Sequence, residues 1–388
     1  MFPFASSRRP HLCLACLALL GCGPAVGPTP APETTVADPL AIPPLPDGSP
    51  ADLLAFVTEL QQRPVHGVSR EEVMAYFAEV AAVSVRAADR VLAQVRPGEQ
   101  FHDEAVKMKI EGLSRLARTG DDRATEALAA YAAELAKGPD ASLAREARLE
   151  VVAGRARAAF AAGDVDAVVG LVKTAAEVLA ADPADADAAV LCMKLAGRLE
   201  RMEGAEEQAI AAYRLVGERL AESPEPAIRK MARSCLGAQV RLGLPGKPIE
   251  IGGTLLDGTP FDQRTLAGKV VLLDFWATWC GPCVAEMPNI RAQYEKYRDR
   301  GLEVVGVSLD EDRAAAAAFV EEKGLTWPVI CGTGEQSGWD QPLAARYGIS
   351  GIPTMFLIGR DGNVIAVDVS GESLAERLAA LFPDAADR

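Results

Sequence analysis

A pair of cysteines that follows directly on an apolar strand pattern constrains the fold of this chain more than any other feature. Residues 269–276 read KVVLLDFW, a short apolar run typical of a strand buried in the centre of a sheet. The motif CGPC follows at residues 280–283, and residues 285–298 then have a helical pattern. The order of strand, cysteine pair and helix places both thiols at the N-terminus of a helix.

The remainder of the C-terminal third continues this alternation of elements. We expect further strands at 302–309, 353–358 and 364–369, with a turn at Asp361-Gly362 before the last of them. Helices are expected at 313–323 and 373–381. The order predicts an α/β sheet in which a strand-helix-strand unit is followed by a hairpin and a closing helix.

These features together resemble the thioredoxin superfamily, in which CGPC follows a strand and Gly351-Ile352-Pro353-Thr354 would form the loop opposite it. The sequence Glu286-Met287-Pro288 and the long insert between strands resemble the extracytoplasmic TlpA/ResA branch, over residues 244–383. The resemblance implies that Pro353 has a cis peptide bond and that Ile352 and Pro353 shape the active site beside a Cys280–Cys283 disulfide.

The resemblance and the helix position together assign roles to the residues of the motif. Cys280 at the helix N-terminus meets unpaired N–H groups and the positive end of the helix dipole, which favour a thiolate. We therefore expect Cys280 to be an exposed nucleophile and Cys283, one turn later, to resolve the mixed disulfide. Pro282 stiffens the loop, and Gly281-Pro282 in this family indicates reducing power.

Two acids and two tryptophans complete the expected site. Asp274 occupies the position where thioredoxins have a buried acid; burial would raise its pKa so that it could exchange a proton with the second cysteine. The partner lysine of the next strand is missing, because 302–309 contains none. Glu286 matches an acid of TlpA-like proteins and would tune the site, and Trp276 and Trp279 would pack around it.

Three other interpretations of the cysteine pair are less favoured. A zinc site would need a second CxxC or clustered histidines, but the chain has only three scattered histidines. An inert disulfide would not account for WCGPC together with Pro353, and a peroxiredoxin would have its reactive cysteine outside a CxxC motif. We expect no metal and no cofactor. Cys331 stands alone and is interpreted as a bystander.

The N-terminus has the features of a bacterial lipoprotein signal. Two arginines precede the apolar run 12–20, which at nine residues is too short to span a bilayer. The run ends in LLGC, so we expect Cys22 to carry lipid after removal of residues 1–21 and to anchor the chain outside the cytoplasm. The alternatives are a secreted protein cut near Gly23 and an uncleaved anchor.

A proline-rich tether at 22–50 leads to a helical region at 51–243. Breaks such as Gly120-Asp121 and Gly163-Asp164 divide this region into about eight or nine helices, and Ser69 with Glu72 predicts a capping box at one of them. The joints resemble those of tetratricopeptide-type pairs, so we expect a helical array or bundle. It could be a spacer or a surface for a protein partner, and we favour the partner.

The formal net charge of −14 argues against nucleic acid as a partner. Cys192 and Cys235 lie in apolar helical stretches and are expected to be buried thiols, although a disulfide between them is compatible with an oxidising compartment. Their pairing cannot be deduced from spacing.

The sequence thus predicts a thioredoxin-like α/β domain at 244–388, preceded by an all-α helical array at 51–243. Its expected activity is reduction of protein disulfides on the periplasmic side of a bacterial membrane, with a membrane thiol-disulfide electron donor restoring the dithiol. Two alternatives stay open: an adaptor whose helices bind a partner, and a disulfide isomerase or oxidase that uses the same cysteines.

Overall fold

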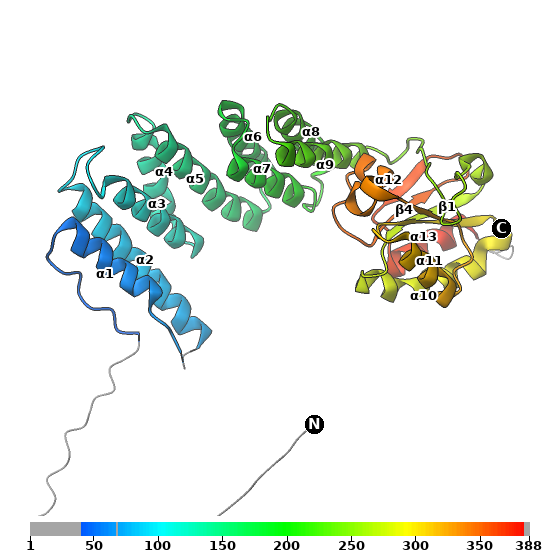
Figure 1. The fold of residues 1–388 in the computed structure, drawn as a ribbon, viewed down its shortest axis with the longest axis horizontal. Coiled ribbons are helices and arrows are strands. Elements are labelled where there is room, and N and C mark those ends of the chain that lie inside the picture. The colour runs from blue at the N-terminus through cyan, green and yellow to red at the C-terminus, as the bar shows by residue number, and fades with distance from the viewer. Residues whose placement is uncertain (1–39, 67–68, 384–388) are drawn as a thin grey trace, which may run out of the picture.

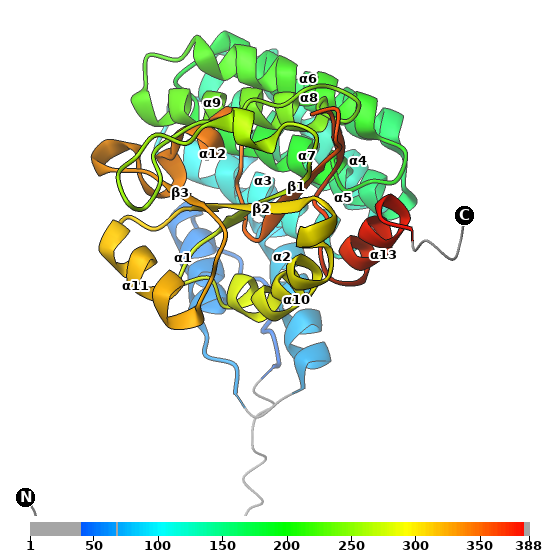
Figure 2. The same cartoon turned by 90° about the vertical axis from the view of Figure 1, so that its right-hand side faces the viewer.

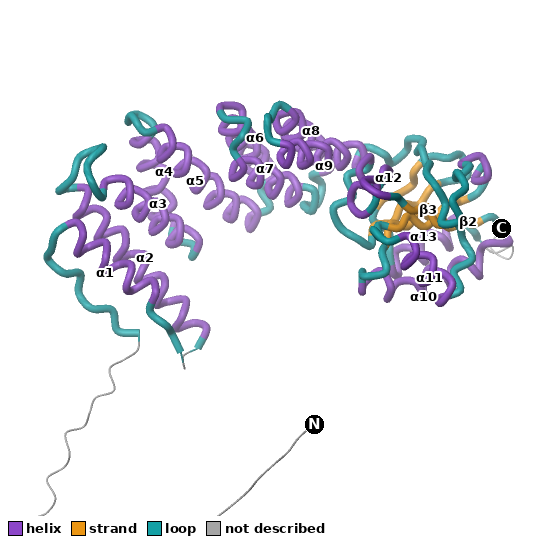
Figure 3. Tube along the Cα trace, in the orientation of Figure 1, coloured by secondary structure: helices purple, strands orange, loops and turns teal. Residues whose placement is uncertain are grey.

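The computed structural model describes residues 40–66 and 69–383 (Figure 1). The expected signal peptide at 1–21, the lipidation site Cys22 and most of the proline-rich tether lie outside the described residues. Within these, an all-helical array is joined to a smaller part that contains every described strand (Figure 3). This is the predicted fold class, a helical array followed by an α/β domain.

Among the residues that the structure describes, nine helices form the array, arranged side by side in an elongated stack that leads away from the sheet (Figure 1). Their bounds are α1 Pro50–Gln62, α2 Arg70–Leu92, α3 His102–Arg118, α4 Asp122–Leu135, α5 Ala141–Ala162, α6 Val165–Ala181, α7 Ala186–Leu199, α8 Glu206–Ala221 and α9 Pro226–Leu242. The expected number of helices and the breaks between them are confirmed.

Local capping explains where several of these helices begin. Ser69 and Glu72 form the predicted capping box at α2, and Ser49 with Asp52 forms a second one at α1 that was not predicted. Aspartates supply the N-cap of four consecutive helices, α4 to α7, by accepting backbone N–H bonds. The helices pack through buried Ala, Leu and Val side chains that form clusters separate from the core of the sheet.

The sheet has five strands in the order β3-β2-β1-β4-β5. Their bounds are β1 Val270–Trp276, β2 Leu302–Ser308, β3 Val329–Cys331, β4 Thr354–Ile358 and β5 Val364–Val367. The pairs β1–β2 and β2–β3 are parallel, whereas β1–β4 and β4–β5 are antiparallel. All seven residues of the central strand β1 are buried, as its apolar sequence predicts. Cys331, interpreted above as a bystander, is the last residue of β3.

In the described part of the chain, four α-helices accompany the sheet: α10 Gly281–Tyr297, α11 Arg313–Lys323, α12 Pro342–Arg346 and α13 Gly371–Leu381. Figures 1 and 2 show α10, α11 and α13 on one side of the sheet, with α12 on the other side, next to α9. The short helix α12 was not predicted from the sequence. Its position matters because it brings the end of the helical array to the sheet.

The segment that follows α9 pairs with the edge strand β5 of the sheet. The Gly246 N–H donates to the carbonyl of Val364 at 2.8 Å, and the Val364 N–H donates to the carbonyl of Lys247 at 2.9 Å. These bonds attach the segment after α9 to β5. Within the described ranges, no helix combines the length and the apolar character needed to cross a membrane.

Candidate active site

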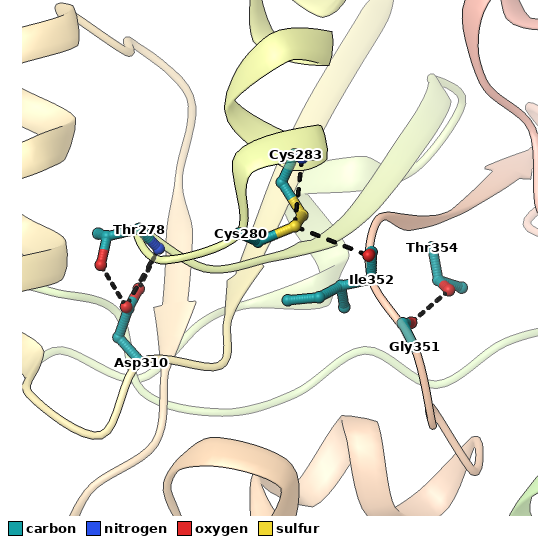
Figure 4. The surroundings of a disulfide bond; sticks show 7 residues. All are labelled: Thr278, Cys280, Cys283, Asp310, Gly351, Ile352 and Thr354. Atoms are coloured by element: carbon teal, nitrogen blue, oxygen red, sulfur yellow. Dashed lines mark hydrogen bonds between the residues drawn. A yellow bond between two sulfur atoms is a disulfide. The ribbon is translucent and has the colours of Figure 1, made fainter. Parts of the chain in front are cut away.

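The two cysteines of the CGPC motif form a disulfide at the start of α10 (Figure 4). Cys280 is the N-cap of this helix, and Gly281 and Pro282 are its first two residues, both exposed. Cys280 is 5% exposed and Cys283 is 2% exposed. The expectation of an exposed Cys280 therefore does not hold for the disulfide form, because neighbouring segments cover its sulfur.

The carbonyl of Ile352 is one of the groups that face this sulfur. It lies 3.6 Å from the Cys280 Sγ, while the Cys283 N–H donates to the same sulfur at 3.2 Å (Figure 4). The peptide bond between Ile352 and Pro353 is cis. The side-chain hydroxyl of Thr354 donates to the carbonyl of Gly351 at 2.8 Å and closes this loop, which we call the cis-Pro loop, residues 351–354.

Asp310, which was not predicted from the sequence, anchors the segment that leads into the motif. Its carboxylate accepts the Thr278 N–H at 3.1 Å and the Thr278 hydroxyl at 2.6 Å (Figure 4). The Ser308 hydroxyl also donates to it, at 2.8 Å. Asp310 is 3% exposed and lies two residues after the end of β2 at Ser308. A polar residue just after a buried parallel strand was the available signal, because the carboxyl ends of neighbouring parallel strands meet.

Asp274 lies inside the sheet, opposite Gly306 of β2, and is 2% exposed. Its Oδ1 has no hydrogen-bond partner among the described residues. Burial in an apolar environment, with a smaller contribution from the negative charge of Glu286, raises the pKa of Asp274 to about 7. The residue opposite Asp274 on β2 is Gly306, and β2 contains no lysine, so no cation from that strand opposes the rise in the pKa of Asp274.

Glu286 connects the active-site helix to the last helix of the chain. Its Oε1 accepts the Gly371 N–H at 2.7 Å and the Asn289 side-chain amide at 2.8 Å. The structure therefore brings Asp274 and Glu286 near each other, but the hydrogen bonds of Glu286 hold α10 against the start of α13.

The two tryptophans of the motif region have different environments. Trp276 is fully buried and packs against Phe319 of α11, with ring centroids 5.3 Å apart. Trp279 is 58% exposed and lies beside Trp339, at 6.2 Å between centroids. Only Trp279 presents its ring to solvent next to the disulfide, and Trp339, which the sequence analysis did not single out, extends that surface.

The other described cysteines are free and buried, namely Cys192, Cys235 and Cys331. Burial raises the pKa of both Cys192 and Cys235 to about 12, so neither is a reactive thiolate at neutral pH. Over the ranges 40–66 and 69–383, no group of three or more His, Cys, Asp or Glu side chains is placed to hold a metal ion.

Comparisons with known proteins match this part of the chain. A family model described as Redoxin matches residues 245–380. The thiol-disulfide oxidoreductase ResA of Bacillus thuringiensis is 38% identical over 125 residues, which cover 32% of this chain and 68% of the relative. ResA of Bacillus subtilis is 35% identical over 111 residues, covering 29% of this chain and 59% of the relative.

Among solved structures, the thioredoxin domain of a Bacteroides vulgatus thiol-disulfide oxidoreductase is 26% identical, with a TM-score of 0.33; the match covers 36% of this chain and 98% of that domain. By its C-terminal domain, the chain belongs to the ResA-like thiol-disulfide oxidoreductases of the thioredoxin superfamily.

Proposed function

We propose that this thiol-disulfide oxidoreductase reduces protein disulfides outside the cytoplasm while anchored to a bacterial membrane through lipid on Cys22. In the dithiol form, the Cys280 thiolate attacks one sulfur of a substrate disulfide and displaces the other as a thiolate. Cys283 then attacks the Cys280 sulfur, which releases the second substrate thiol and leaves the Cys280–Cys283 disulfide. A membrane dithiol protein supplies the two electrons that restore the dithiol.

The disulfide beside the Ile352 carbonyl is the observation that carries this proposal. That carbonyl, 3.6 Å from the Cys280 Sγ, can accept a hydrogen bond from a protonated thiol but would repel a thiolate. The Cys283 N–H has the opposite effect, because it donates to the sulfur. A less stabilised thiolate makes the dithiol a stronger reductant, so the carbonyl favours the reducing direction.

Asp274 supports the second step. Since its pKa is raised to about 7, it can take a proton as Cys283 becomes a nucleophile and return it near neutral pH. We propose this proton-transfer role for Asp274, a positioning role for Glu286, and a substrate-facing role for Trp279 and the cis-Pro loop.

The equilibrium reduction potential of the Cys280–Cys283 pair tests the direction. We expect a value near that of thioredoxin, about −270 mV, from thiol alkylation in dithiothreitol or glutathione buffers. A value near that of the oxidant DsbA, about −120 mV, would instead establish an oxidase or isomerase. If Cys280→Ser leaves the cellular phenotype and the bound partners unchanged, the adaptor alternative holds.

The anchoring and the domain limits are parts of the same proposal. A lipid-labelling experiment on the full chain, with Cys22→Ser as the matched variant, tests the anchor: we expect the label on the wild type only. We also propose that the array occupies 51–243 and the catalytic domain 244–388. This is consistent with the end of α9 at Leu242 and with the burial of Leu244 in the core of the sheet domain.

A further inference from the structure

Two adjoining hollows lie between α9 and the segment that leads into the cis-Pro loop. The larger, of about 410 Å³, is lined by α7, α9 and residues 348–354, and the smaller, of about 170 Å³, extends along α9 to Trp339. The hollows share Ser234 of α9 and residues 348–350, so they form one groove. We call it the α9 groove.

The α9 groove is continuous with the reacting disulfide. Ile352 lines the larger hollow, and its carbonyl lies 3.6 Å from the Cys280 Sγ. At the other end Trp339 lines the smaller hollow and packs against the exposed Trp279 of the active-site motif. When a substrate polypeptide forms a mixed disulfide with Cys280, the residues beside the substrate's cysteine would therefore reach the groove.

The wall opposite the cis-Pro loop is held in place by backbone contact. A side chain on Gly237 of α9 would overlap the backbone at Gly348, and a side chain on Gly348 would overlap the backbone at Ala238. Two ion pairs flank this contact: Lys230 with Asp340 at 2.7 Å, and Arg241 with Asp368 at 3.0 Å. The groove is thus formed jointly by the array and the catalytic domain.

The charges of the groove indicate what it would bind. Each of its three carboxylates already has a cationic partner. Asp340 pairs with Lys230, and both Glu200 and Asp368 pair with Arg241. Arg201 lines the larger hollow and Arg233 the smaller, and both are exposed. Across 40–66 and 69–383, neither guanidinium forms an ion pair. Two cations therefore remain for a ligand in a chain with a net charge of −14.

We propose that the α9 groove binds the polypeptide beside the substrate's cysteine and selects segments that carry carboxylates. This inference rests on the proposed function and deepens it, because it gives the helical array a part in substrate selection. Arg201 and Arg233 would each meet a carboxylate, since arginine is suited to bidentate pairing with that group. They are specificity-determining residues and take no part in the exchange of sulfur bonds.

Single-turnover reduction of three peptides tests this proposal. Each peptide has one cysteine in mixed disulfide with 2-mercaptoethanol and differs only in two flanking residues, Glu, Gln or Lys. The full chain is first reduced with dithiothreitol and desalted. It then passes two electrons to the peptide disulfide, releases 2-mercaptoethanol and the peptide thiol, and becomes the Cys280–Cys283 disulfide. Tryptophan fluorescence follows the rate at low and high salt.

We expect the wild type to reduce the Glu peptide about three- to tenfold faster than the Lys peptide at low salt, with the ratio falling at high salt. Arg201→Gln/Arg233→Gln should bring the ratio close to one. The matched control is Arg155→Gln/Arg214→Gln, which removes two exposed, unpaired arginines of the array that do not line the groove, and it should keep the wild-type ratio.

Bis(2-hydroxyethyl) disulfide, a small neutral substrate, separates this inference from the proposed function. All three proteins should reduce it at the same rate. Equal rates of the wild type on the three peptides, or an unchanged ratio in Arg201→Gln/Arg233→Gln, would overturn the groove proposal alone. Failure of every protein to reduce the small disulfide would overturn the proposed function and the groove proposal with it.

Discussion

At the scale of single residues, the site depends on acids that are removed from water. Asp274 has a free carboxylate oxygen inside the sheet, whereas Asp310 has its oxygens occupied by Thr278 and Ser308. Two aspartates in the same domain therefore have different roles. An acid without partners has a raised pKa and can move protons, while one saturated with donors holds a loop in position.

The first prediction concerns the pH dependence of stability. Below about pH 4 the Asp274 carboxyl is neutral in both the folded and the unfolded chain. Its burial then lowers the free energy of unfolding least. As the pH rises to the folded-state pKa of about 7, only the unfolded chain releases the proton, and stability falls, by up to about 4 kcal/mol. Asp274→Asn lacks this loss.

Urea unfolding of the oxidised wild type and of Asp274→Asn between pH 4 and pH 8 measures this effect. The variant should gain stability relative to the wild type as the pH rises. A difference that stays constant over the whole range would show that Asp274 has an ordinary pKa.

The second prediction concerns Asp310. Asp310→Ala removes the acceptor of the Thr278 N–H, the Thr278 hydroxyl and the Ser308 hydroxyl, and should lower the free energy of unfolding by about 2–3 kcal/mol. It should also slow disulfide reduction, because Thr278 leads directly into the motif. The control Thr278→Val removes only the hydroxyl bond and should cost about 1 kcal/mol in urea unfolding at pH 7. Equal stability of Asp310→Ala and wild type would contradict the anchoring role.

At the scale of elements, α9 is the helix that connects the array to the catalytic domain. It begins with Pro226 at its first position and ends at Leu242, and Gly237 in its middle faces the backbone at Gly348. Glycine lowers the intrinsic stability of a helix, so its presence in α9 has to be explained by packing. The close approach of the two backbones supplies that reason.

The third prediction uses the same substitution at two glycines of the array. Gly237→Ala should destabilise the protein by about 1–3 kcal/mol, because the added methyl group overlaps the backbone at Gly348. Gly170→Ala in α6 should instead stabilise it by about 1 kcal/mol, since that position has nothing within 4 Å. Thermal unfolding of both variants gives the sign of each change in stability. A stabilising effect of Gly237→Ala, as expected for Gly170→Ala, would contradict a tight contact at Gly237.

At the scale of the whole molecule, one buried guanidinium joins the array to the catalytic domain. The Arg241 side chain is 7% exposed and pairs with Glu200 at 2.6 Å and with Asp368 at 3.0 Å. The pKa of Asp368 is raised because burial outweighs the opposing effect of Arg241. Removal of the arginine would leave two partly buried carboxylates facing each other without a cation.

The fourth prediction is that Arg241→Gln lowers the free energy of unfolding by about 2–3 kcal/mol at neutral pH. The loss should be smaller at acid pH, because the raised pKa of Asp368 favours the neutral form of that carboxyl, which does not need the arginine. Arg148→Gln is the control: it removes an exposed ion pair with Glu177 within the array and should cost less than about 1 kcal/mol. Denaturant titrations at both pH values provide the comparison. Similar losses in the two variants would mean that Arg241 does not join the two parts.

Much of the fold could be predicted because its signals are short-range. The predicted cap at Ser69 acts within three residues, and β1 is recognisable as a continuous apolar run. Helix α12 was missed because five residues are too few to show a helical period. The capping box at Ser49 was not predicted, because the density of prolines before it favours an extended tether up to residue 50.

The sequence by itself determined the order of elements, the helix boundaries and the position of the cysteine pair at a helix N-terminus. These depend on contacts between near neighbours in the chain. Only the tertiary structure decided that Cys280 is covered, that Asp310 holds Thr278 from 32 residues away, and that Arg241 reaches Asp368 across 127 residues. Such contacts arise when separate elements pack, and no local pattern of residues records which surfaces will meet.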